Sequence, residues 1–536
     1  MPRLAARQQP SRPYFMDLPA ARRYTTPMKT TPIPLRPASR IRAGAAALAL
    51  FLLAAPSLHA QQSLAGDPGV AEALHLLDVW MDAAQAYGGI PGASLSVVHD
   101  QELVWAKGYG YAHVEREERA TPSTMYSICS ISKLFTAVGV LQLRDQGKVD
   151  LDDPVAKHLD WFDIQDDDPA AGPVTVEGLL THTSGLPREA GAPYWTGPDY
   201  PFPTHEQIVG TLPTQSMLYP PRTYYQYSNL GLTLAGEIVA AASGQPYDDY
   251  IRANILDPLG MTSTFTDHED RFRDGRLASG YTARGRDGKR RPVPDYRVRG
   301  ISPAAGFIST VEDLGRFASW QFRVLAGDDA LLDRNTLREM HRVHWLEPDG
   351  DTTYGLGFSV WQSDGDTFAG HGGSCPGYRS HLLLRPQDKV ATAFMANGQG
   401  VNSRRFAQTA YDIVAPALRK AAGKPDGGTP ADGTAPGAAG GAAADRETLM
   451  RFTGTYQRPL GGESAVLIRE GDLHVLPLPT DDPLDALTRL RHIEDGVFRR
   501  VRDNGDLGEQ FRFEALPDGR MLMWRNDNYS VRAAGM

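Results

Sequence analysis

Residues 421–445 constrain the fold of this chain more than any other feature of its sequence. Nine of these 25 residues are alanine, seven are glycine and three are proline, so the segment lacks the side chains that build a core. Chains of this composition behave as flexible linkers. We therefore expect two separately folded parts, a long one over about 75–420 and a smaller one over 446–536.

The sequence of the smaller part predicts an antiparallel β-domain. Apolar and polar residues alternate within short segments such as 465–469, 472–478 and 509–515. Pairs that favour turns, among them Asn504-Gly505, separate these segments, and this combination is typical of a meander of β-strands. The length of this part suits a small barrel or a sandwich.

The long part mixes the periodicities of strands and helices, which predicts an α/β fold. Residues 93–98 and 102–112 alternate as paired strands do, while 131–147 repeats apolar residues with the period of a helix that ends at a glycine. Ser309 and Glu312 have the spacing of a capping box and predict the start of a second helix. The expected core face of the first helix consists of Ile131, Leu134, Phe135, Val138 and Leu141.

Composition and charge exclude several classes of protein. Hydrophobic residues make up 41% of the chain, charged residues make up 22%, and the mean hydropathy is −0.36, which excludes a disordered chain and argues against a membrane protein of several spans. The net charge of −9 divides into +8 for residues 1–60 and −17 for the remainder. Because that remainder would repel a polyanion, we expect no nucleic-acid partner.

Residues 1–60 predict a leader that contains a secretory signal peptide. Their apolar run, 43–55, follows Arg40 and Arg42 and is 13 residues long, which is too short to span a bilayer and suits the apolar region of a signal. Cleavage after Ala60 would release a periplasmic or secreted protein without a stable membrane span. An uncleaved anchor helix is the alternative.

Ser130 and Lys133 stand three residues apart at the start of the predicted helix. On a helix this spacing places both side chains on one face, so the amine can reach the hydroxyl. A serine becomes an effective nucleophile when a base removes its proton, and a desolvated lysine can act as that base. On its own, the pair is more often a helix N-cap followed by a solvated lysine.

Three further motifs follow in order: L-L-T-H-T-S-G-L-P at 179–187, Tyr227-Ser228-Asn229, and His371-Gly372-Gly373 followed by Ser374. With them the chain resembles the penicillin-recognising serine hydrolases, in the branch that contains class C β-lactamases, D-aminopeptidases, D-alanyl-D-alanine carboxypeptidases and related esterases. The resemblance covers about residues 75–420. It implies a β-lactamase/transpeptidase-like fold, an antiparallel sheet flanked by helices with an all-helical subdomain beside it.

The resemblance also implies a role for the residues of the first motifs. Ser130 would be the acylated nucleophile, and Lys133 would take or relay its proton. Tyr227 would be a general base whose phenolate is favoured by neighbouring cations. Asn229 would bind the substrate amide, and no metal or organic cofactor is implied.

The third motif would hold the substrate from a strand edge. The backbone N–H groups of Ser374 and Ser130 would form an oxyanion hole next to Gly373. His371 stands where classical β-lactamases carry a lysine, so a permanent cation is replaced by a titratable one. If charged His371 anchors a carboxylate, turnover of carboxylate-bearing substrates should fall as the pH rises through its pKa.

The two cysteines are too few for a disulfide scaffold or a cysteine-rich zinc site, which leaves free thiols or one bridge. Cys129 precedes the predicted nucleophile, and Cys375 follows the third motif. These positions match the bridged pair of certain class A carbapenem-hydrolysing enzymes, to which the resemblance extends. We therefore hypothesise a Cys129–Cys375 disulfide in the exported protein.

Other suggestive residues have ordinary explanations. His182 lies in a segment that is structural in the resembling family, so we expect it to support the site. His341 and His344 have helical spacing without an acidic motif beside them, which favours a surface helix over a metal site. The aromatic residues within 194–200 either line the mouth of the pocket or pack a loop.

Together these expectations describe an exported serine hydrolase that cleaves amides or esters through a Ser130 acyl-enzyme. Its partners would be small-molecule or peptide substrates, such as a β-lactam or a D-amino-acid peptide from cell wall. Two alternatives stay open. One is a penicillin-binding sensor or scaffold that deacylates slowly, and the other is a D-aminopeptidase, carboxypeptidase or esterase that does not turn over β-lactams.

Overall fold

The computed structural model describes residues 63–533 except 192–193, 269–271, 273–274, 349, 351–352, 364, 424–443, 460 and 526–527. The predicted leader, 1–60, and most of the predicted linker, 421–445, lie outside the described residues and stay predictions. Within the described part, no helix combines the length and the apolar character needed to cross a bilayer.

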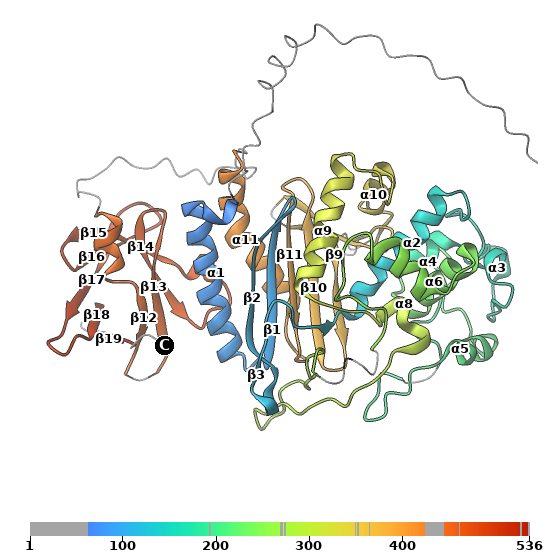
Figure 1. Ribbon diagram of the computed structural model, residues 1–536, viewed down its shortest axis with the longest axis horizontal. Coiled ribbons are helices and arrows are strands. Elements are labelled where there is room, and N and C mark those ends of the chain that lie inside the picture. The colour runs from blue at the N-terminus through green and yellow to red at the C-terminus, as the bar shows by residue number, and fades with distance from the viewer. Residues whose placement is uncertain are drawn as a thin grey trace, which may run out of the picture. The chain divides into compact units, whose positions relative to one another are not determined.

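Among the described residues, nine antiparallel strands form one sheet in the order β3-β2-β1-β11-β10-β9-β8-β7-β6 (Figure 1). The predicted pair of strands is confirmed as β1 and β2, with Ala93 opposite Tyr109. The strands are β1 (Gly92–His99), β2 (Glu102–His113), β3 (Glu118–Arg119), β6 (Trp345–Leu346), β7 (Thr353–Tyr354), β8 (Ser359–Ser363), β9 (Asp366–Cys375), β10 (Tyr378–Arg385) and β11 (Val390–Ala396).

Helices cover both faces of this sheet (Figure 1). α1 (Pro68–Tyr87) and α11 (Ser403–Ala421) pack on one face, and α9 (Val311–Ala326) packs on the other. Successive residues of a strand point to opposite faces. Every residue of β11 is therefore buried: Phe394 belongs to the core beneath α1 and α11, and Met395 to the core beneath α9.

The predicted helix over 131–147 is confirmed as α2 (Ser132–Asp145), and Gly147 follows it with a φ of +70°. Its expected core residues are all fully buried. Its other faces are buried as well, because α6, α8 and α9 surround it. The helix is therefore buried on all sides from Ser132 to Leu143, whereas the sequence predicted only one buried face.

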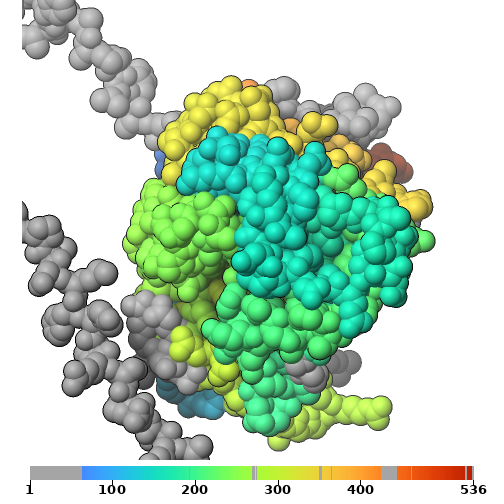
Figure 2. Space-filling view, turned by 90° about the vertical axis from the view of Figure 1, so that its right-hand side faces the viewer, coloured from blue at the N-terminus to red at the C-terminus, as the bar shows by residue number. Residues whose placement is uncertain are grey.

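The remaining helices form a helical part around α2, and Figure 2 looks onto its surface, where the teal and green segments lie side by side. A two-stranded sheet of β4 and β5 lies beside it. The elements are β4 (Tyr126–Ser127), α3 (Val155–His158), α4 (Val176–Thr181), α5 (His205–Thr211), α6 (Asn229–Ser243), α7 (Tyr247–Ile251), α8 (Ser302–Ala305), β5 (Ile308–Ser309) and α10 (Arg334–Met340).

The predicted capping box of Ser309 and Glu312 is wrong by one residue. The N-cap of α9 is Thr310, whose hydroxyl accepts a hydrogen bond from the backbone N–H of Asp313 at 3.1 Å. Ser309 instead ends β5, where its hydroxyl contacts that of Thr264. The sequence offers two overlapping capping patterns here, and only the strand pairing of Ser309 selects between them.

The C-terminal part is a closed antiparallel barrel, which confirms the expected β-domain and decides for a barrel over a sandwich. Its first strand follows α12 (Arg446–Met450), and α13 (Pro483–Ala486) interrupts the meander. The strands are β12 (Gly454–Gln457), β13 (Glu463–Arg469), β14 (Asp472–Leu478), β15 (Thr488–Glu494), β16 (Val497–Val501), β17 (Leu507–Ala515), β18 (Met521–Arg525) and β19 (Asn528–Arg532).

Strand β13 of the barrel is apolar on both of its faces. Val466 and Ile468 belong to the core inside the barrel, whereas Ala465 and Leu467 belong to the core that includes α1. The indole N–H of Trp80 on α1 also donates to the carbonyl oxygen of Thr480 at 3.0 Å. The outer face of β13 is therefore a packing surface rather than a solvated one.

Candidate active site

Ser130 lies at the junction between a sharp turn and the N-terminus of α2. It belongs to the 3₁₀-helix η3 (Cys129–Ile131), which runs directly into α2. Cys129 has a φ of +52°, a left-handed conformation that residues other than glycine rarely adopt. The chain therefore turns just before Ser130 and leaves its side chain at the meeting point of two recesses.

The amine of Lys133 lies next to Ser130 and is fully buried. Its Nζ is 3.3 Å from Ser130 Oγ, 2.8 Å from Asn229 Oδ1 and 2.7 Å from the backbone oxygen of Ala304. Burial lowers the pKa of Lys133 well below its ordinary value, because the charged form loses its water; the Glu189 carboxylate opposes this effect.

Three oxygen atoms surround Nζ, and burial favours the uncharged amine over the ammonium ion. An uncharged lysine has two N–H donors and one lone pair, whereas an ammonium ion has three donors and no lone pair. The oxygens of Asn229 and Ala304 take the two donors. The lone pair is then left for the hydroxyl of Ser130, which is the arrangement that a general base requires.

Asn229 is held between two neighbours. Its Oδ1 accepts from Lys133, and its Nδ2 donates to Glu189 Oε1 at 2.8 Å. Glu189 in turn accepts from the hydroxyl of Tyr194 and pairs with the Nε of Arg188 at 3.2 Å. Neither Glu189 nor Arg188 was predicted, and the only signal for them is their place directly after the motif at 179–187.

Tyr227 completes the surroundings of Ser130, and its role as a general base stays a prediction. Burial raises its pKa to about 12, and the hydrogen bond with Ser130 and the charge of Arg188 offset this only in part. The guanidinium carbon of Arg188 lies 4.8 Å from the centre of the ring. The raised pKa favours the protonated phenol over the phenolate near neutral pH.

His182 has the supporting position that the sequence suggested. Its Nδ1 accepts a hydrogen bond from the backbone N–H of Ser228 at 3.2 Å. The backbone carbonyl oxygen of His182 accepts one from the backbone N–H of Gln226 at 2.7 Å. Its ring packs against the ring of Tyr227, with 4.3 Å between the centres. Burial lowers the pKa of His182 well below its ordinary value, so a neutral imidazole braces the segment that carries Tyr227.

His371 is buried on β9, and its role in binding a substrate carboxylate stays a prediction. Its Nδ1 lies 2.6 Å from the carbonyl oxygen of Gly372, and its Nε2 lies 2.9 Å from the hydroxyl of Tyr354. Burial lowers the pKa of His371 to about 3. The imidazole is therefore uncharged near neutral pH and offers no charge to a substrate carboxylate.

The rest of the third motif lies along an open strand edge beside Ser130. Among the described residues, β8 pairs only with the first half of β9, so 371–375 are paired with β10 alone. A Cβ atom on Gly373 would lie 2.2 Å from the carbonyl oxygen of Ile128, so only glycine lets β9 come this close. Ser374 is exposed on this edge, a placement that suits an oxyanion hole shared with the backbone of Ser130.

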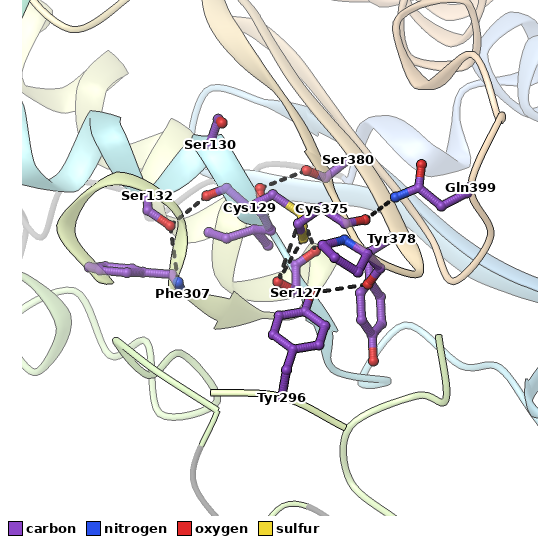
Figure 3. Close-up of a disulfide and its surroundings, with 12 residues drawn as sticks. Ser127, Cys129, Ser130, Ser132, Tyr296, Phe307, Cys375, Tyr378, Ser380 and Gln399 are labelled. Carbon is purple, nitrogen blue, oxygen red and sulfur yellow. Dashed lines mark hydrogen bonds between the residues drawn. A yellow bond between two sulfur atoms is a disulfide. The ribbon is translucent and has the colours of Figure 1, made fainter. Parts of the chain in front are cut away.

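Cys129 and Cys375 form a disulfide, as hypothesised (Figure 3). Their Cα atoms are 5.7 Å apart although 246 residues separate them in the chain. The hydroxyl of Ser127 contacts the sulfur of Cys375 at 3.2 Å, and the side chain of Gln399 donates to the carbonyl oxygen of Cys375. The bond ties the turn before Ser130 to the end of β9, so both sides of the predicted oxyanion hole are fixed together.

Two recesses meet at Ser130 and Ser374. The first, which we call the wide recess, has a volume of about 590 Å³ and is bordered by Glu189, Asn229 and an aromatic and aliphatic wall. That wall includes Trp195, Tyr200 and Val293. Both expectations for the aromatic residues within 194–200 therefore hold, each for different residues. Trp195 and Tyr200 line the recess, whereas Tyr194 is buried and contacts Glu189.

The second recess, which we call the cationic recess, has a volume of about 510 Å³ and lies on the side of Tyr227 and His371. Three guanidinium groups border it, those of Arg188, Arg379 and Arg404, and no carboxylate borders it in the described structure. The Nε of Arg379 is buried without a hydrogen-bond partner. Positive charge is therefore concentrated on this side of Ser130.

The predicted surface helix with His341 and His344 is wrong. α10 ends before His341, whose Nε2 lies 2.9 Å from Gln321 Oε1, while His344 Nδ1 lies 3.2 Å from Glu177 Oε1. The two rings bind different partners and do not converge. In the part of the chain that the structure describes, no three His, Cys, Asp or Glu side chains are grouped to hold a metal ion.

Comparisons with known proteins agree with this geometry. A family model described as Beta-lactamase matches residues 77–417. The chain is 28% identical over 360 residues to Beta-lactamase-like protein 2 of Dictyostelium discoideum, which covers 65% of this chain. The chain spans 64% of the length of that relative.

Two solved structures extend the likeness. The octameric penicillin-binding protein homologue from Pyrococcus abyssi is 26% identical with a TM-score of 0.56, and the match covers 86% of this chain and 100% of that one. The D-amino acid amidase from Ochrobactrum anthropi SV3 is 26% identical with a TM-score of 0.53, covering 66% of this chain and 98% of that one. The fold of the long part is thus a β-lactamase/transpeptidase-like fold, as expected.

Proposed function

Because this chain belongs to the beta-lactamase family and is a serine hydrolase, we propose that it cleaves amide bonds in small peptides that contain D-amino acids. The reaction would proceed through an acyl-enzyme on Ser130, in the periplasm or outside the cell. The observation that carries the proposal is the buried amine of Lys133, which lies 3.3 Å from Ser130 Oγ and also contacts Asn229 Oδ1 and the carbonyl oxygen of Ala304.

The reaction follows from these groups in two steps. Ser130 Oγ attacks the carbonyl carbon while its proton passes to Lys133 Nζ, and the C–N bond breaks as the leaving nitrogen takes up that proton by way of the Tyr227 hydroxyl. Water then attacks the ester carbon and gives a proton to Lys133. The proton returns to Oγ as the carboxylic acid leaves.

The wide recess supports a large apolar group on the acyl side of the scissile bond. Asn229 borders this recess and does not border the cationic one. Its volume of about 590 Å³ and the wall that contains Trp195 and Tyr200 suit an aromatic or branched side chain. The structural likeness to a D-amino acid amidase favours an amino-acid amide over a simple ester here.

The cationic recess supports a carboxylate on the leaving group. Tyr227, the proton donor of the first step, borders this recess and not the wide one, so the departing nitrogen would lie there. His371 is neutral, and the charge that meets a carboxylate would come from Arg379 and Arg404. A short peptide that ends in a free carboxylate meets both conditions.

Intact-mass time courses test this proposal. We would mix the purified protein, and Ser130→Ala beside it, with amides of D- and L-phenylalanine, a D-Ala-D-Ala peptide and benzylpenicillin. The proposal expects Ser130-dependent release of product from the D-compounds and little from the L-amide. A benzylpenicillin adduct that persists while no peptide is cleaved would indicate a sensor instead, and turnover of benzylpenicillin alone would indicate a β-lactamase.

Export is tested separately by the N-terminus of the protein recovered from a cell that makes the full chain. The proposal expects a mature chain that begins at Gln61. A full-length chain found with the membrane would show that residues 1–60 act as an anchor.

A further inference from the structure

The direction of the Asn229 amide decides what Lys133 can do. The two ends of a carboxamide have nearly the same shape but opposite hydrogen-bonding character. With Oδ1 toward Lys133, Asn229 accepts an N–H of the amine at 2.8 Å. With the amide turned over, its NH₂ group would face Nζ and compete with Ser130 for the lone pair. Nothing in Lys133 itself forbids the second arrangement.

Glu189 removes this ambiguity. A carboxylate only accepts hydrogen bonds, so its Oε1, 2.8 Å from Asn229 Nδ2, requires the NH₂ end of the amide on its own side. Asn229 is 2% exposed, so a reversed amide would leave a buried polar group facing Glu189 without a matching partner. The oxygen of Asn229 is thereby fixed toward Lys133.

Glu189 is itself held in place from behind. The hydroxyl of Tyr194 donates to its Oε2, and the backbone N–H of Ala190 donates to the same hydroxyl at 3.2 Å. Tyr194 is fully buried, and its ring packs on Phe202 with 5.4 Å between the centres. A continuous chain of hydrogen bonds therefore runs from a buried tyrosine to the nucleophile, and the wide recess opens at its middle.

We propose that Glu189 is a positioning residue that sets the Asn229 amide so that Lys133 presents its lone pair to Ser130. The inference rests on the proposed function, because it concerns the proton transfer that activates Ser130. In that step the O–H bond of Ser130 breaks, its proton binds Nζ, and Oγ forms the new bond to the substrate. Glu189 acts through Asn229 and does not itself contact the transferred proton.

The charge of Glu189 adds a second effect that a merely structural residue would lack. The charged or titratable groups that act on Lys133 are Glu189 and Arg188, with the neutral rings of His182, His371 and Tyr227 around them. Glu189 is the one carboxylate among these groups and raises the pKa of Lys133. Replacing it with glutamine should therefore lower the pKa of Lys133 further and move the acidic limb of the activity profile to lower pH.

The test measures the rate at which a fluorophosphonate labels Ser130, by intact mass, from pH 4 to 9. This probe forms an O–P bond to Oγ and releases fluoride, so it reports activation of Ser130 without a known substrate. We compare Glu189→Gln, Glu189→Asp, Tyr194→Phe and, as a matched control on the barrel, Glu494→Gln. Far-ultraviolet circular dichroism and thermal melting show whether each variant is folded.

We expect Glu189→Gln to label about 10- to 100-fold more slowly at its plateau, the effect of losing one charge-assisted hydrogen bond, and to show an acidic limb at lower pH than the unchanged protein. Glu189→Asp should keep the limb of the unchanged protein. Tyr194→Phe should slow labelling without moving the limb, and Glu494→Gln should change neither.

Two results would overturn the inference. One is a folded Glu189→Gln variant that labels within twofold of the unchanged protein with the same pH profile. The other is slow labelling with an unmoved acidic limb, which would make Glu189 only a structural support. If the unchanged protein itself is not labelled at Ser130, the proposed function fails, and that result is separate from either of these.

Discussion

At the scale of single residues, the site depends on a lysine whose pKa is lowered by burial. Each unit by which burial lowers the pKa of Lys133 corresponds to about 1.4 kcal/mol against the ammonium form. The oxygens of Asn229 and Ala304 accept two hydrogen bonds from Nζ. The lone pair of the uncharged amine can then take up one proton. The same burial that removes the charge thus creates the base.

A first prediction concerns this base. Lys133→Arg replaces it with a guanidinium that stays protonated, so fluorophosphonate labelling of Ser130 should slow by about 10²- to 10⁴-fold. In the unchanged protein, labelling should rise with pH as Lys133 loses its proton and reach its plateau well below pH 10.5, because burial lowers the pKa. Stopped-flow or quench measurements between pH 4 and 10 check both statements.

Lys133→Met serves as the control for size, because methionine is apolar and of similar length. It should fold and label as slowly as Lys133→Arg. Fast labelling of either variant, or a midpoint near pH 10.5 in the unchanged protein, would contradict the assignment of Lys133 as the base.

A second prediction concerns the charge that receives a carboxylate. Two thioesters with the same acyl group, benzoylglycyl-thioglycolate and its methyl ester, differ only in the charge of the leaving group. Arg404→Gln should lower kcat/KM for the anionic thioester by about fivefold, the effect of an exposed charge pair of about 1 kcal/mol, and leave the neutral one unchanged. Arg338→Gln on α10 is the control.

The same pair of substrates tests His371. Its pKa of about 3 keeps the ring neutral, so the ratio of kcat/KM for the two thioesters should be constant from pH 5 to 8. A ratio that falls with rising pH through that range would restore His371 as the cation and count against Arg404.

At the scale of elements, the site is made by the close approach of η3 to the open edge of β9. Gly373 allows this approach, and the disulfide between Cys129 and Cys375 maintains it. β9 can offer its edge because β8 pairs only with the other half of the strand. The predicted oxyanion hole would therefore be formed by two backbone segments rather than by any side chain.

A third prediction follows for Gly373→Ala. The added Cβ would lie 2.1 Å from Ser380 Oγ and 2.2 Å from the carbonyl oxygen of Ile128, so β9 must move away from η3. Labelling of Ser130 should fall by about 100-fold, the effect of losing one oxyanion donor. Gly210→Ala on α5 is the matched control, since nothing lies within 4 Å of the Cβ it adds.

If both glycine variants label Ser130 at the same rate, the approach of β9 does not matter to the chemistry. Thermal melting separates this outcome from misfolding. Gly373→Ala should lower the melting temperature only moderately, because the disulfide still ties Cys129 to Cys375.

At the scale of the whole molecule, several histidines are buried without charge, which makes the fold sensitive to acid. Burial lowers the pKa of His341 to about 4 and the pKa values of His371 and His381 to about 3. In the unfolded chain these rings take up protons near pH 6.5. Between pH 6.5 and these lowered values, the unfolded state therefore binds more protons than the folded one, and stability falls as the pH falls.

A fourth prediction gives the magnitude of this loss of stability at low pH. Each of these histidines should remove about 1.4 kcal/mol of stability per unit of pH below 6.5. Melting temperatures measured from pH 7 to 4.5 should decline, and His381→Gln, which cannot take up a proton, should show a shallower decline. An equal slope in both proteins would show that His381 does not contribute.

Much of the fold was predictable because it depends on local periodicity. The strand pair β1 and β2, the helix α2 and the barrel strands of 446–536 all follow from alternation, helical spacing and turn residues. The start of α9 was missed, since two overlapping capping patterns differ only in the tertiary pairing of Ser309. The helix expected at His341 and His344 failed because α10 ends at Met340.

The sequence by itself determined which reactive groups the chain carries and in what order, because spacing along one helix already brings Ser130 and Lys133 together. Only the tertiary structure decided their protonation. Charge states depend on burial and on neighbours that are distant in sequence, so the neutral Lys133, the protonated Tyr227 and the uncharged His371 appear only when α2, α6 and β9 are packed. The contact between Glu189 and Asn229 was also decided by the tertiary structure. These residues are 40 positions apart, and no sequence pattern predicts a contact at that separation.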